Sequence, residues 1–426
     1  MSEYDAEIGI VGAGPAGARA AELLAGHGAK VLLWDPKAPW EKPCGGGLPA
    51  SAFRNVPELR EMIPEAQRID GIRVEVSPEA GFTVPLDHPL YIVSRLALAR
   101  WQLDRAIGAG AELVRDAVRT IERVDGGWSL ATRSGRHWTV RLLVGADGAA
   151  SLVRRIASPG LEVELDPTRV AYPSGAGTTP ETMVLKFYDD VEGYLWDVPR
   201  SDHRSLGIGL QPGTWNRPRM DGEVEEYRRS REACECETPE RAGAVIGAAG
   251  FSHGDYSGVG GSDFALLGDA AGFADPATGE GIENALRSAG FLADAYAVDG
   301  HLGSYPARAR SVLEREFRVS RWARKALFDR RLGTRLVRRG MEADWAYALG
   351  AAVANATNEH DPGLFRLLRR AWAAHRHVRR NPDAANRGAR HPAPCRCRDA
   401  ECGHEGDPRD SSSAPTTVPI PEPVRG

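Results

Sequence analysis

The chain has 426 residues, of which 42% are hydrophobic and 26% charged, which is ordinary for an enzyme of two or three domains. Its net charge of −4 gives no overall attraction to nucleic acid, so we expect no nucleic-acid partner. No apolar run approaches the roughly 20 residues that a membrane-spanning helix requires, and the acidic residues 1–7 do not resemble a secretory signal. Six unevenly spaced cysteines do not suggest a disulfide framework, and we expect a cytoplasmic protein.

The first motif in the chain is the glycine fingerprint Gly12-x-Gly14-x-x-Gly17. Gly12 permits a tight turn, Gly14 lets backbone N–H groups approach a pyrophosphate, and Gly17 allows close packing of helix on strand. The positive end of the helix dipole attracts phosphates, and Asp35, about 20 residues on, is placed to accept hydrogen bonds from a ribose hydroxyl. The motif therefore predicts a dinucleotide site. Around it we expect a strand, a helix and a second strand, over residues 7–11, 18–25 and 31–34.

The segment 42–47, Lys-Pro-Cys-Gly-Gly-Gly, places three consecutive glycines after a cysteine. Such a loop lies with its backbone against something flat or large, although a flexible surface loop with an inert thiol is the alternative.

Strands and one helix are expected to follow. Residues 72–76 alternate as a half-buried strand does, and residues 82–84 can pair with them. Ser94 is expected to cap a helix over residues 95–108. Further strands are expected at 90–93, 111–114, 118–121, 128–131 and 138–144, the last followed by Gly-Ala-Asp-Gly at 145–148.

From about residue 156 to 262 the composition changes to short strands with many glycines and prolines and little helix. This indicates an inserted, largely antiparallel substrate domain. It contains Tyr-Leu-Trp-Asp-Val-Pro at 194–199, followed by Gly-Ile-Gly at 207–209. Alternating aromatic residues on a strand belong more often to a core than to a site, so both interpretations stay open.

A buried strand over 264–267 breaks at Gly268-Asp269, and a helix opens by Ile282. The N-terminus of that helix would offer free N–H groups to an electron-rich edge of a ligand. Residues 305–380 are helical and strongly cationic. Basic amphipathic helices rest on an anionic membrane surface or present a solvated face.

Beyond residue 380 the chain turns polar and proline-rich, which predicts a disordered tail. The tail holds four potential zinc ligands, but their spacing matches no common structural zinc motif, so no metal site is predicted. They are Cys395, Cys397, Cys402 and His404.

Together these segments resemble the geranylgeranyl reductase family, within the wider group of p-hydroxybenzoate hydroxylase-like flavoproteins, over about residues 5–340. The wider group shares the glycine fingerprint, Gly-Ala-Asp-Gly at 145–148, and Gly-Asp-Ala-Ala-Gly at 268–272 with Pro276. Two motifs are narrower: the loop 42–47, and Tyr-x-Trp-x-Phe-Pro followed by Gly-x-Gly. Here Val198 stands where the family has Phe, a difference that bears on pocket width and so on the choice of substrate.

The resemblance implies an α/β fold, with a Rossmann-type FAD-binding domain, an inserted antiparallel β-sheet substrate domain and a C-terminal helical region. The expected boundaries are 1–60, 90–155 and 262–300 for the FAD-binding domain, 61–89 and 156–261 for the substrate domain, 301–380 for the helical region and 381–426 for the tail.

The resemblance also implies FAD as the cofactor. Ala16 and Asp35 would contact its ADP half, Asp269 the ribityl–phosphate region, and N–H groups of Gly281 and Ile282 the pyrimidine edge of the flavin. The FAD-binding residues are then Gly12, Gly14, Pro15, Ala16, Gly17, Asp35, Cys44, Gly45, Gly46, Arg95, Val118, Asp269, Gly281 and Ile282. The substrate-binding residues are Tyr194, Trp196, Pro199, Gly207 and Gly209.

Family members saturate double bonds of prenyl chains, and this chemistry suggests three catalytic residues. An isolated alkene accepts hydride poorly, so a proton must arrive before or with the hydride. Tyr194 and Trp196, two apart on a strand, point to the same side and would stabilise the developing positive charge with their aromatic faces. Cys44, in apolar surroundings that favour the thiol, is the candidate proton donor or relay.

The expected substrate is an isoprenoid, or a prenylated lipid or quinone. No second glycine fingerprint is evident, so the electrons would come from a diffusible donor, NAD(P)H or ferredoxin. The basic helices are candidates for membrane contact.

Two other functions stay open. A flavin monooxygenase or halogenase would act on a small hydrophobic substrate. Halogenases of this type carry Trp-x-Trp-x-Ile-Pro, and this chain lacks their lysine. A flavin-bearing assembly protein would recruit partners through the basic helices and the tail. Anaerobic turnover tests the first, and deletion of the residues after Arg380 tests the second.

Overall fold

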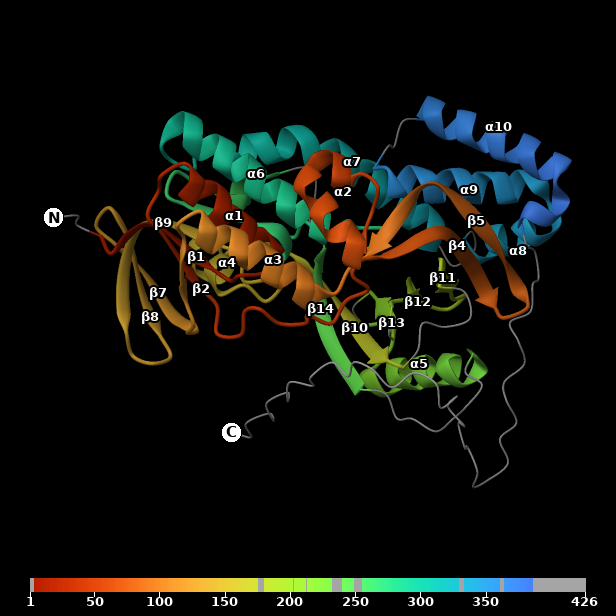
Figure 1. Ribbon diagram of the computed structural model, residues 1–426, viewed down its shortest axis with the longest axis horizontal. Helices are drawn as coiled ribbons and strands as arrows, with labels where there is room; N and C mark the ends of the chain where they lie inside the picture. The colour runs from red at the N-terminus through yellow and green to blue at the C-terminus, as the bar shows by residue number, and fades with distance from the viewer. Residues whose placement is uncertain are drawn as a thin grey trace, which may run out of the picture.

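The computed structural model describes residues 4–174, 180–201, 203–211, 213–231, 240–248, 255–328, 333–360 and 364–385. Two sheets lie side by side along the long axis of the molecule, and most of the helices cover one side of both (Figure 1). Among the helices of these residues, none is long and apolar enough to cross a membrane.

The first sheet is built around parallel strands whose apolar residues are buried on both faces. In spatial order it contains β6 (Glu112–Val114), β2 (Val31–Trp34), β1 (Ala6–Val11), β9 (His137–Gly145), β8 (Gly127–Thr132) and β7 (Val118–Val124), with β15 (Phe264–Leu266) also paired with β9. Strands β7, β8 and β9 form an antiparallel meander. The helices of this half are α1 (Pro15–Gly26), α3 (Arg95–Gly108), α4 (Leu152–Ala157), α6 (Ile282–Asp299) and α7 (Tyr305–Phe328).

The second sheet is antiparallel except where β11 runs parallel to β4. In spatial order it contains β14 (Glu240–Ala248), β10 (Glu164–Tyr172), β13 (Arg204–Leu210), β12 (Gly193–Pro199), β11 (Thr182–Phe187), β4 (Gln67–Ser77), β5 (Ala80–Ile92) and β3 (Gly47–Leu48). The parallel sheet, the antiparallel sheet and the C-terminal helices confirm the predicted fold class.

The two faces of the second sheet have different covers (Figure 1). On one face, Met220, Val224 and Tyr227 of α5 (Arg217–Arg231) pack on Leu195 and Leu206. On the other face, three C-terminal helices pack around Phe82 and Val84, the first two on β4 and β5 and the third on the second helix. These helices are α8 (Gly333–Glu342), α9 (Asp344–Asn358) and α10 (Leu364–Arg380).

A smaller cluster joins the two halves. The short helix α2 (Ala52–Asn55) and a 3-10 segment (Pro57–Glu65) contribute Phe53 and Leu59, which pack with Leu98 of α3 and Ile282 of α6. The start of α6 is therefore held against the N-terminal third of the chain.

Several expectations about elements are confirmed and others are wrong. Helix α3 spans the predicted residues, and the Ser94 hydroxyl accepts from the Ala97 N–H as the predicted cap. Helix α1 begins three residues earlier than predicted, and residues 90–92 belong to β5 rather than to a separate strand.

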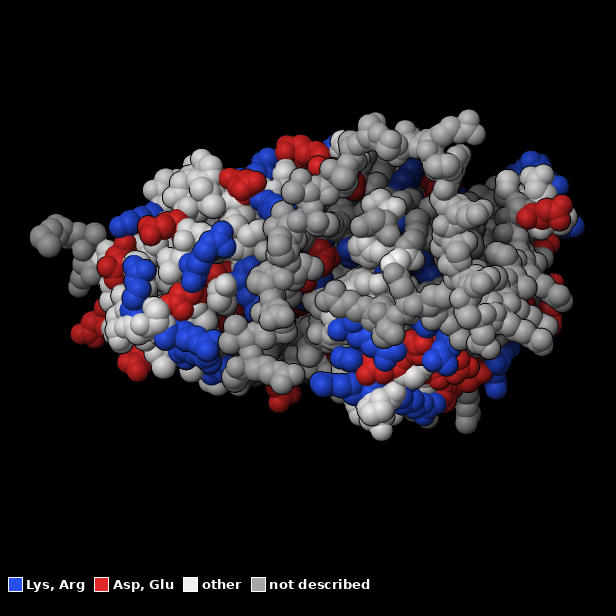
Figure 2. Space-filling model, turned by 60° about the horizontal axis from the view of Figure 1, so that its bottom comes forward, with Lys and Arg blue, Asp and Glu red and all other residues white. Residues whose placement is uncertain are grey.

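Two larger errors concern the second sheet. The expectation of little helix between residues 156 and 262 missed α5, whose few apolar residues are embedded among charged ones. Strand β4 is not half-buried, because Arg73 and Glu75 on its polar face are also buried. Glu75 accepts a hydrogen bond from the Arg73 Nε at 3.0 Å and another from Arg231 of α5. Figure 2 shows charges of both signs intermixed at the lower right, the side on which α5 lies in Figure 1.

Candidate active site

The three fingerprint glycines have different surroundings. Gly12 has a φ of +99°, and a Cβ there would lie 2.3 Å from the Ala146 carbonyl oxygen. A Cβ on Gly17 would lie 1.8 Å from the Gly12 carbonyl oxygen, so α1 can approach the turn this closely only with glycine there. Around Gly14, by contrast, no atom of the described residues lies within 4 Å of the Cβ position. The space over Gly14 is open to a ligand.

The N-terminus of α1 opens into the same space. Gly14 is the N-cap and Pro15 the first residue, and within the described chain no side chain caps this end. The first turn carries no acidic residue. Free N–H groups and the positive end of the helix dipole therefore remain available to an anion such as a diphosphate.

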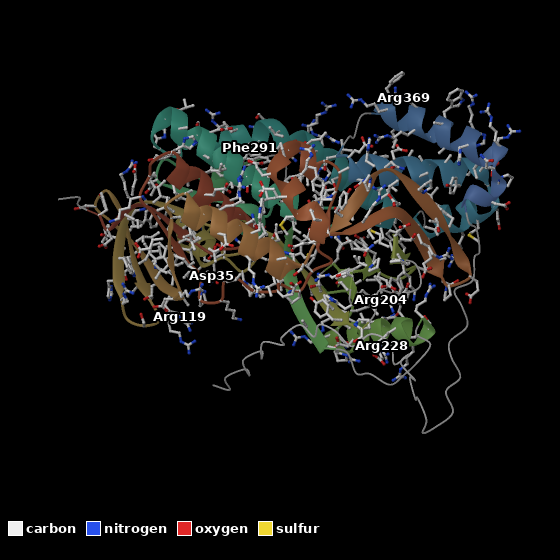
Figure 3. All side chains as sticks on the ribbon, in the orientation of Figure 1. Asp35, Arg119, Arg204, Arg228, Phe291 and Arg369 are labelled. Atoms are coloured by element: carbon white, nitrogen blue, oxygen red, sulfur yellow. The ribbon has the colours of Figure 1, made fainter. Side chains whose placement is uncertain are left out.

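Asp35 directly follows β2 and ties the fingerprint to the next loop (Figure 3). Its Oδ2 accepts from the Ala13 N–H at 3.0 Å, and its Oδ1 accepts from the N–H groups of Lys37 and Ala38. A carboxylate oxygen has about two acceptor positions, so Oδ2 retains one for a ribose hydroxyl.

Three other residues predicted to contact FAD lie in this half. Ala16 is buried in α1, and Val118 is half-buried at the start of β7. Arg95 at the start of α3 is 6% exposed, and its Nε has no hydrogen-bond partner in the described chain. A buried unpaired donor of this kind is explained when a ligand supplies the acceptor.

The loop 42–47 is held by polar contacts from the second sheet. The Arg200 Nη2 and the Ser205 hydroxyl both donate to the Cys44 carbonyl, at 3.1 and 3.2 Å. Gly46 has a φ of +79°, and a Cβ there would lie 2.4 Å from the Val93 carbonyl oxygen. Cys44 is half-buried, and its Sγ accepts from the Gly46 N–H at 3.4 Å. The surroundings of Cys44 are thus more polar than expected from the sequence.

Glu41, which the sequence analysis did not identify, connects this loop to α3. It accepts from the Ser94 hydroxyl at 3.0 Å, the Leu96 N–H at 2.6 Å and the Arg200 Nη1 at 2.9 Å. Burial alone would raise the pKa of Glu41, but the hydrogen bond and charge of Arg200 and the N–H groups of α3 outweigh it, and the pKa is lowered. No sequence motif marks this residue, because its partners come from two other segments.

Tyr194 and Trp196 lie side by side on β12, as predicted, with ring centroids 6.2 Å apart. The Trp196 Nε1 donates to the Ser205 hydroxyl at 3.3 Å, and the Tyr194 hydroxyl donates to the Thr278 carbonyl. Burial raises the pKa of Tyr194 well above its usual range. A Cβ on Gly207 would lie 2.3 Å from the Trp196 Cζ2, so this glycine makes room for the indole.

The remaining residues predicted to bind substrate flank this pair. Gly209 lies two residues after Gly207 on β13, and a Cβ at Gly209 would be 3.4 Å from the Trp196 Cζ3. Pro199 is buried at the end of β12, paired with Arg204. Their roles toward substrate stay predictions.

Asp269, Gly281 and Ile282 meet at the start of α6. The Lys42 Nζ lies 3.0 Å from the Asp269 Oδ2. A Cβ on Gly281 would lie 3.1 Å from the Asp269 Oδ1. Gly281 is the N-cap of α6 and has no side chain of its own to cap the helix. In the described part of the chain, the N–H groups of Gly281 and Ile282 have no hydrogen-bond acceptor.

An ionisable cluster that the sequence analysis missed lies at the same helix start. Glu280, Glu283 and His360 bring a ligand atom each to within 4.8 Å of one another. Glu283 accepts from the Ser51 hydroxyl and the Asn55 amide, and its Oε2 lies 3.2 Å from the His360 Nδ1. The Glu280 Oε1 accepts from the Glu283 N–H at 2.9 Å, whereas its Oε2 is buried with no partner in the described chain.

The neighbours of these three groups give them different charges. Burial raises the pKa of Glu280 to about 7, and the negative charge of Glu283 adds to the rise. For Glu283 and His360, their mutual hydrogen bond and attraction outweigh burial, so the pKa of Glu283 is lowered and that of His360 is raised. Near neutral pH the cluster is thus a His360–Glu283 ion pair beside a Glu280 that is only partly ionised.

The sequence carries only part of this cluster. Glu280 and Glu283 are visible at the start of a predicted helix, but His360 comes from the end of α9. The four potential zinc ligands of the tail, Cys395, Cys397, Cys402 and His404, lie outside the described residues.

These residues fit an elongated dinucleotide. The uncapped start of α1 and the open side of Gly14 suit its diphosphate, and the unpaired Arg95 Nε offers a further donor. Helices α1 and α6 pack together, and the start of α6 also carries free N–H groups.

Comparison with known proteins agrees with this geometry. No protein-family model matches the chain. Geranylgeranyl diphosphate reductase of Rhodobacter capsulatus is 31% identical over 320 residues, which cover 69% of this chain and 75% of that protein. Digeranylgeranylglycerophospholipid reductase 1 of Methanopyrus kandleri is 29% identical over 346 residues, covering 74% of this chain and 87% of that protein.

Solved structures share the fold. A geranylgeranyl bacteriochlorophyll reductase-like protein from Thermoplasma acidophilum superposes with a TM-score of 0.68 at 17% identity, covering 89% of this chain and 99% of that one. Halogenase PltM, in complex with phloroglucinol and FAD, superposes with a TM-score of 0.62 at 15% identity, covering 91% and 86%. The sequence similarity is more specific than the fold, and it shows that this chain belongs to the geranylgeranyl reductase family of FAD-dependent oxidoreductases.

Proposed function

We propose that the chain saturates carbon–carbon double bonds of a geranylgeranyl-type isoprenoid, carried as a diphosphate or in a prenylated lipid or quinone. The substrates named for the two relatives support this class. The observation that carries the proposal is the contact between the glycine loop and the aromatic pair. A Cβ on Gly45 would lie 3.9 Å from the Trp196 Nε1 and 3.8 Å from the Val198 Cγ2. The loop expected beside the flavin thus borders Trp196 and Val198, whose apolar groups suit a hydrocarbon chain.

The cofactor would be held by residues from both ends of the site. Gly14 and the start of α1 suit the diphosphate, Asp35 a ribose, and the N–H groups of Gly281 and Ile282 the pyrimidine edge. A helix N-terminus stabilises negative charge at that edge. When bound and reduced, FAD supplies the hydride that the alkene accepts.

The aromatic pair would stabilise positive charge that develops on the alkene carbon. Trp196 and Tyr194 offer ring faces, and a cation near such a face is stabilised by about 1 kcal/mol or more when water is excluded. Because the pKa of Tyr194 is raised, its ring stays neutral and does not present a phenolate that would trap the cation. For Trp196→Ala we expect weakened substrate binding with normal reduction of the flavin by dithionite.

Cys44 is the proposed proton donor or relay. It lies in the loop that borders Trp196, and its carbonyl is fixed by Arg200 and Ser205. We expect Cys44→Ser to keep bound FAD while alkene reduction slows. Turnover at the wild-type rate would reduce Cys44 to a lining residue.

The proposed electron source is a diffusible carrier, NAD(P)H or ferredoxin. Each can be supplied to the purified FAD-loaded protein, and flavin bleaching then shows which one serves.

Anaerobic turnover tests the reaction itself. The FAD-loaded protein, reduced with dithionite, is incubated with geranylgeranyl diphosphate, and the products are followed by mass spectrometry. We expect species that gain two hydrogens for each bond reduced. A product that forms only in air and gains oxygen or halogen would instead identify a monooxygenase or halogenase.

A further inference from the structure

The outward face of α10 exposes three large apolar side chains. Phe365 is 81% exposed, Leu368 59% and Trp372 60%. Their spacing of three and four residues places them on one face of the helix. Large apolar groups gathered on a surface mark a place where something binds.

The opposite face fixes the orientation of the helix. Val378 is 1% exposed and packs with Phe82 and Tyr347 in the cluster beneath α9. The Arg370 Nη2 lies 2.6 Å from the Glu359 Oε2 at the end of α9. The apolar stripe therefore points away from the protein and is not available to its core.

Arginines surround this stripe. Helix α10 contains no Asp or Glu, and five of its arginines are exposed: Arg366, Arg369, Arg376, Arg379 and Arg380. The Arg376 guanidinium carbon lies 4.5 Å from the centroid of the Trp372 ring. Figure 3 shows Arg369 at the outer edge of the molecule.

We propose that this face of α10 docks on an anionic lipid bilayer. An amphipathic helix lies in a membrane interface with its apolar residues at the acyl boundary, and tryptophan favours that depth. Arginine forks bind phosphate groups in a bidentate way, and anionic lipids attract each added cation. Phe365, Leu368 and Trp372 supply the apolar contact, while the arginines bind the headgroup phosphates.

A second copy of the chain fits this face less well. A two-fold interface sets the same patch against itself, so the arginines of one α10 would face those of the other. No carboxylate on α10 would offset that repulsion.

Vesicle binding tests the proposal without any turnover, so its outcome is separate from that of the proposed function. The FAD-loaded full chain is sedimented with phosphatidylcholine vesicles that either contain or lack phosphatidylglycerol. We expect binding that is at least about tenfold tighter with phosphatidylglycerol and that weakens as salt is raised.

Two variants separate the apolar and charged contributions. Phe365→Gln, Leu368→Gln and Trp372→Gln combined should remove binding to both kinds of vesicle. Arg366→Gln, Arg369→Gln and Arg376→Gln combined should remove the preference for phosphatidylglycerol and the salt dependence. The matched control is Val298→Gln at the end of α6, because Val298 is 71% exposed but belongs to the other half of the molecule. Circular dichroism and thermal unfolding check that each variant folds.

Three outcomes would overturn the proposal. The first is equal binding of the wild type to both kinds of vesicle, and the second is full binding by the triple apolar variant. The third is a wild type that is a dimer and a triple apolar variant that is a monomer, when neither protein binds vesicles. The last outcome would make the face a protein interface.

Discussion

Glycines build both halves of the site, but they serve different contacts in each. In the nucleotide half, Gly12 and Gly17 bring backbone against backbone, where a Cβ would lie within 2.3 Å of a carbonyl oxygen. In the substrate half, Gly207 clears space for the ring of Trp196. A backbone contact depends only on the local turn, whereas space for an indole depends on which side chain the neighbouring strand provides. The first kind of glycine can therefore be identified from spacing alone.

The interiors of the two sheets also differ. The first sheet packs mainly against aliphatic and aromatic residues. The second buries a charged group of Arg73, Glu75 and Arg231 between β4 and α5. Removing one member of such a group leaves an uncompensated buried charge, which is strongly destabilising. Removing one apolar side chain from the first sheet leaves no such charge.

The largest effect is expected at the backbone contact. Gly17→Ala places a Cβ 1.8 Å from the Gly12 carbonyl oxygen, so the turn and α1 must separate. We expect a loss of about 4 kcal/mol or more in the free energy of unfolding, or failure to fold. Gly14→Ala is the matched control, because its Cβ meets open space. It should unfold like the wild type but bind FAD more weakly, and equal FAD affinity in Gly14→Ala would contradict the assigned diphosphate position.

The second prediction concerns the buried charges. Glu75→Gln removes the carboxylate that pairs with Arg73 and Arg231, and we expect a loss of about 3 kcal/mol in denaturant unfolding. Arg68→Gln on the same strand breaks an exposed pair with Asp70, which water screens, and should cost far less than Glu75→Gln. Equal losses in the two variants would show that the buried group does not stabilise the second sheet.

These comparisons explain what could be predicted from the sequence. The turn at Gly12, the strand pair β1 and β2, and the cap at Ser94 follow from local rules, and the structure has them. Alternation predicts a solvent face for the side of β4 that carries Arg73 and Glu75, because it shows that a strand has two faces but not what covers each of them. Helix α5 was missed because its apolar face has only three residues among many charged ones and Gly222. These three are Met220, Val224 and Tyr227.

Within the site, residues that belong to sequence motifs could be predicted, whereas residues that reach the site from distant segments could not. The aromatic pair and the glycine loop were identified by their motifs, and the structure brings them together. Glu41, Arg200 and His360 carry no motif, because each acts through residues distant in the sequence. The prediction of apolar surroundings for Cys44 was wrong because the sequence does not reveal that Arg200 lies beside it.

The third prediction uses the ionisable cluster at the start of α6. The pKa of Glu280 is raised to about 7, so the folded state holds this proton more tightly than the unfolded chain does. The stabilisation is complete below the ordinary glutamate pKa and is lost as pH rises through about 7. Glu280→Gln removes that loss, so the variant should gain about 2 kcal/mol over the wild type between about pH 5 and 8, measured by denaturant unfolding.

Glu283→Gln is the control with the opposite sign. The pKa of Glu283 is lowered by its hydrogen bond and attraction to His360, so its contribution is present above the ordinary glutamate pKa and lost as pH falls through its folded value. This variant should be less stable than the wild type near neutral pH, with a difference that shrinks in acid. If both variants shifted stability in the same direction with pH, the assignment of charges in the cluster would be wrong.

The smallest effect is expected where a glycine makes room for a side chain. Gly207→Ala would set a Cβ 2.3 Å from the Trp196 Cζ2 and 2.8 Å from the Arg169 carbonyl oxygen, so the buried indole must shift, and we expect a loss of about 1–2 kcal/mol in stability. The displaced ring should raise the KM for an isoprenoid substrate several-fold while flavin reduction by dithionite stays normal. Gly209→Ala, whose Cβ would lie 3.4 Å from the same ring, should change neither value measurably. An unchanged KM in Gly207→Ala, with the ring shown to have moved, would remove Trp196 from the substrate site and leave Gly207 as a packing residue alone.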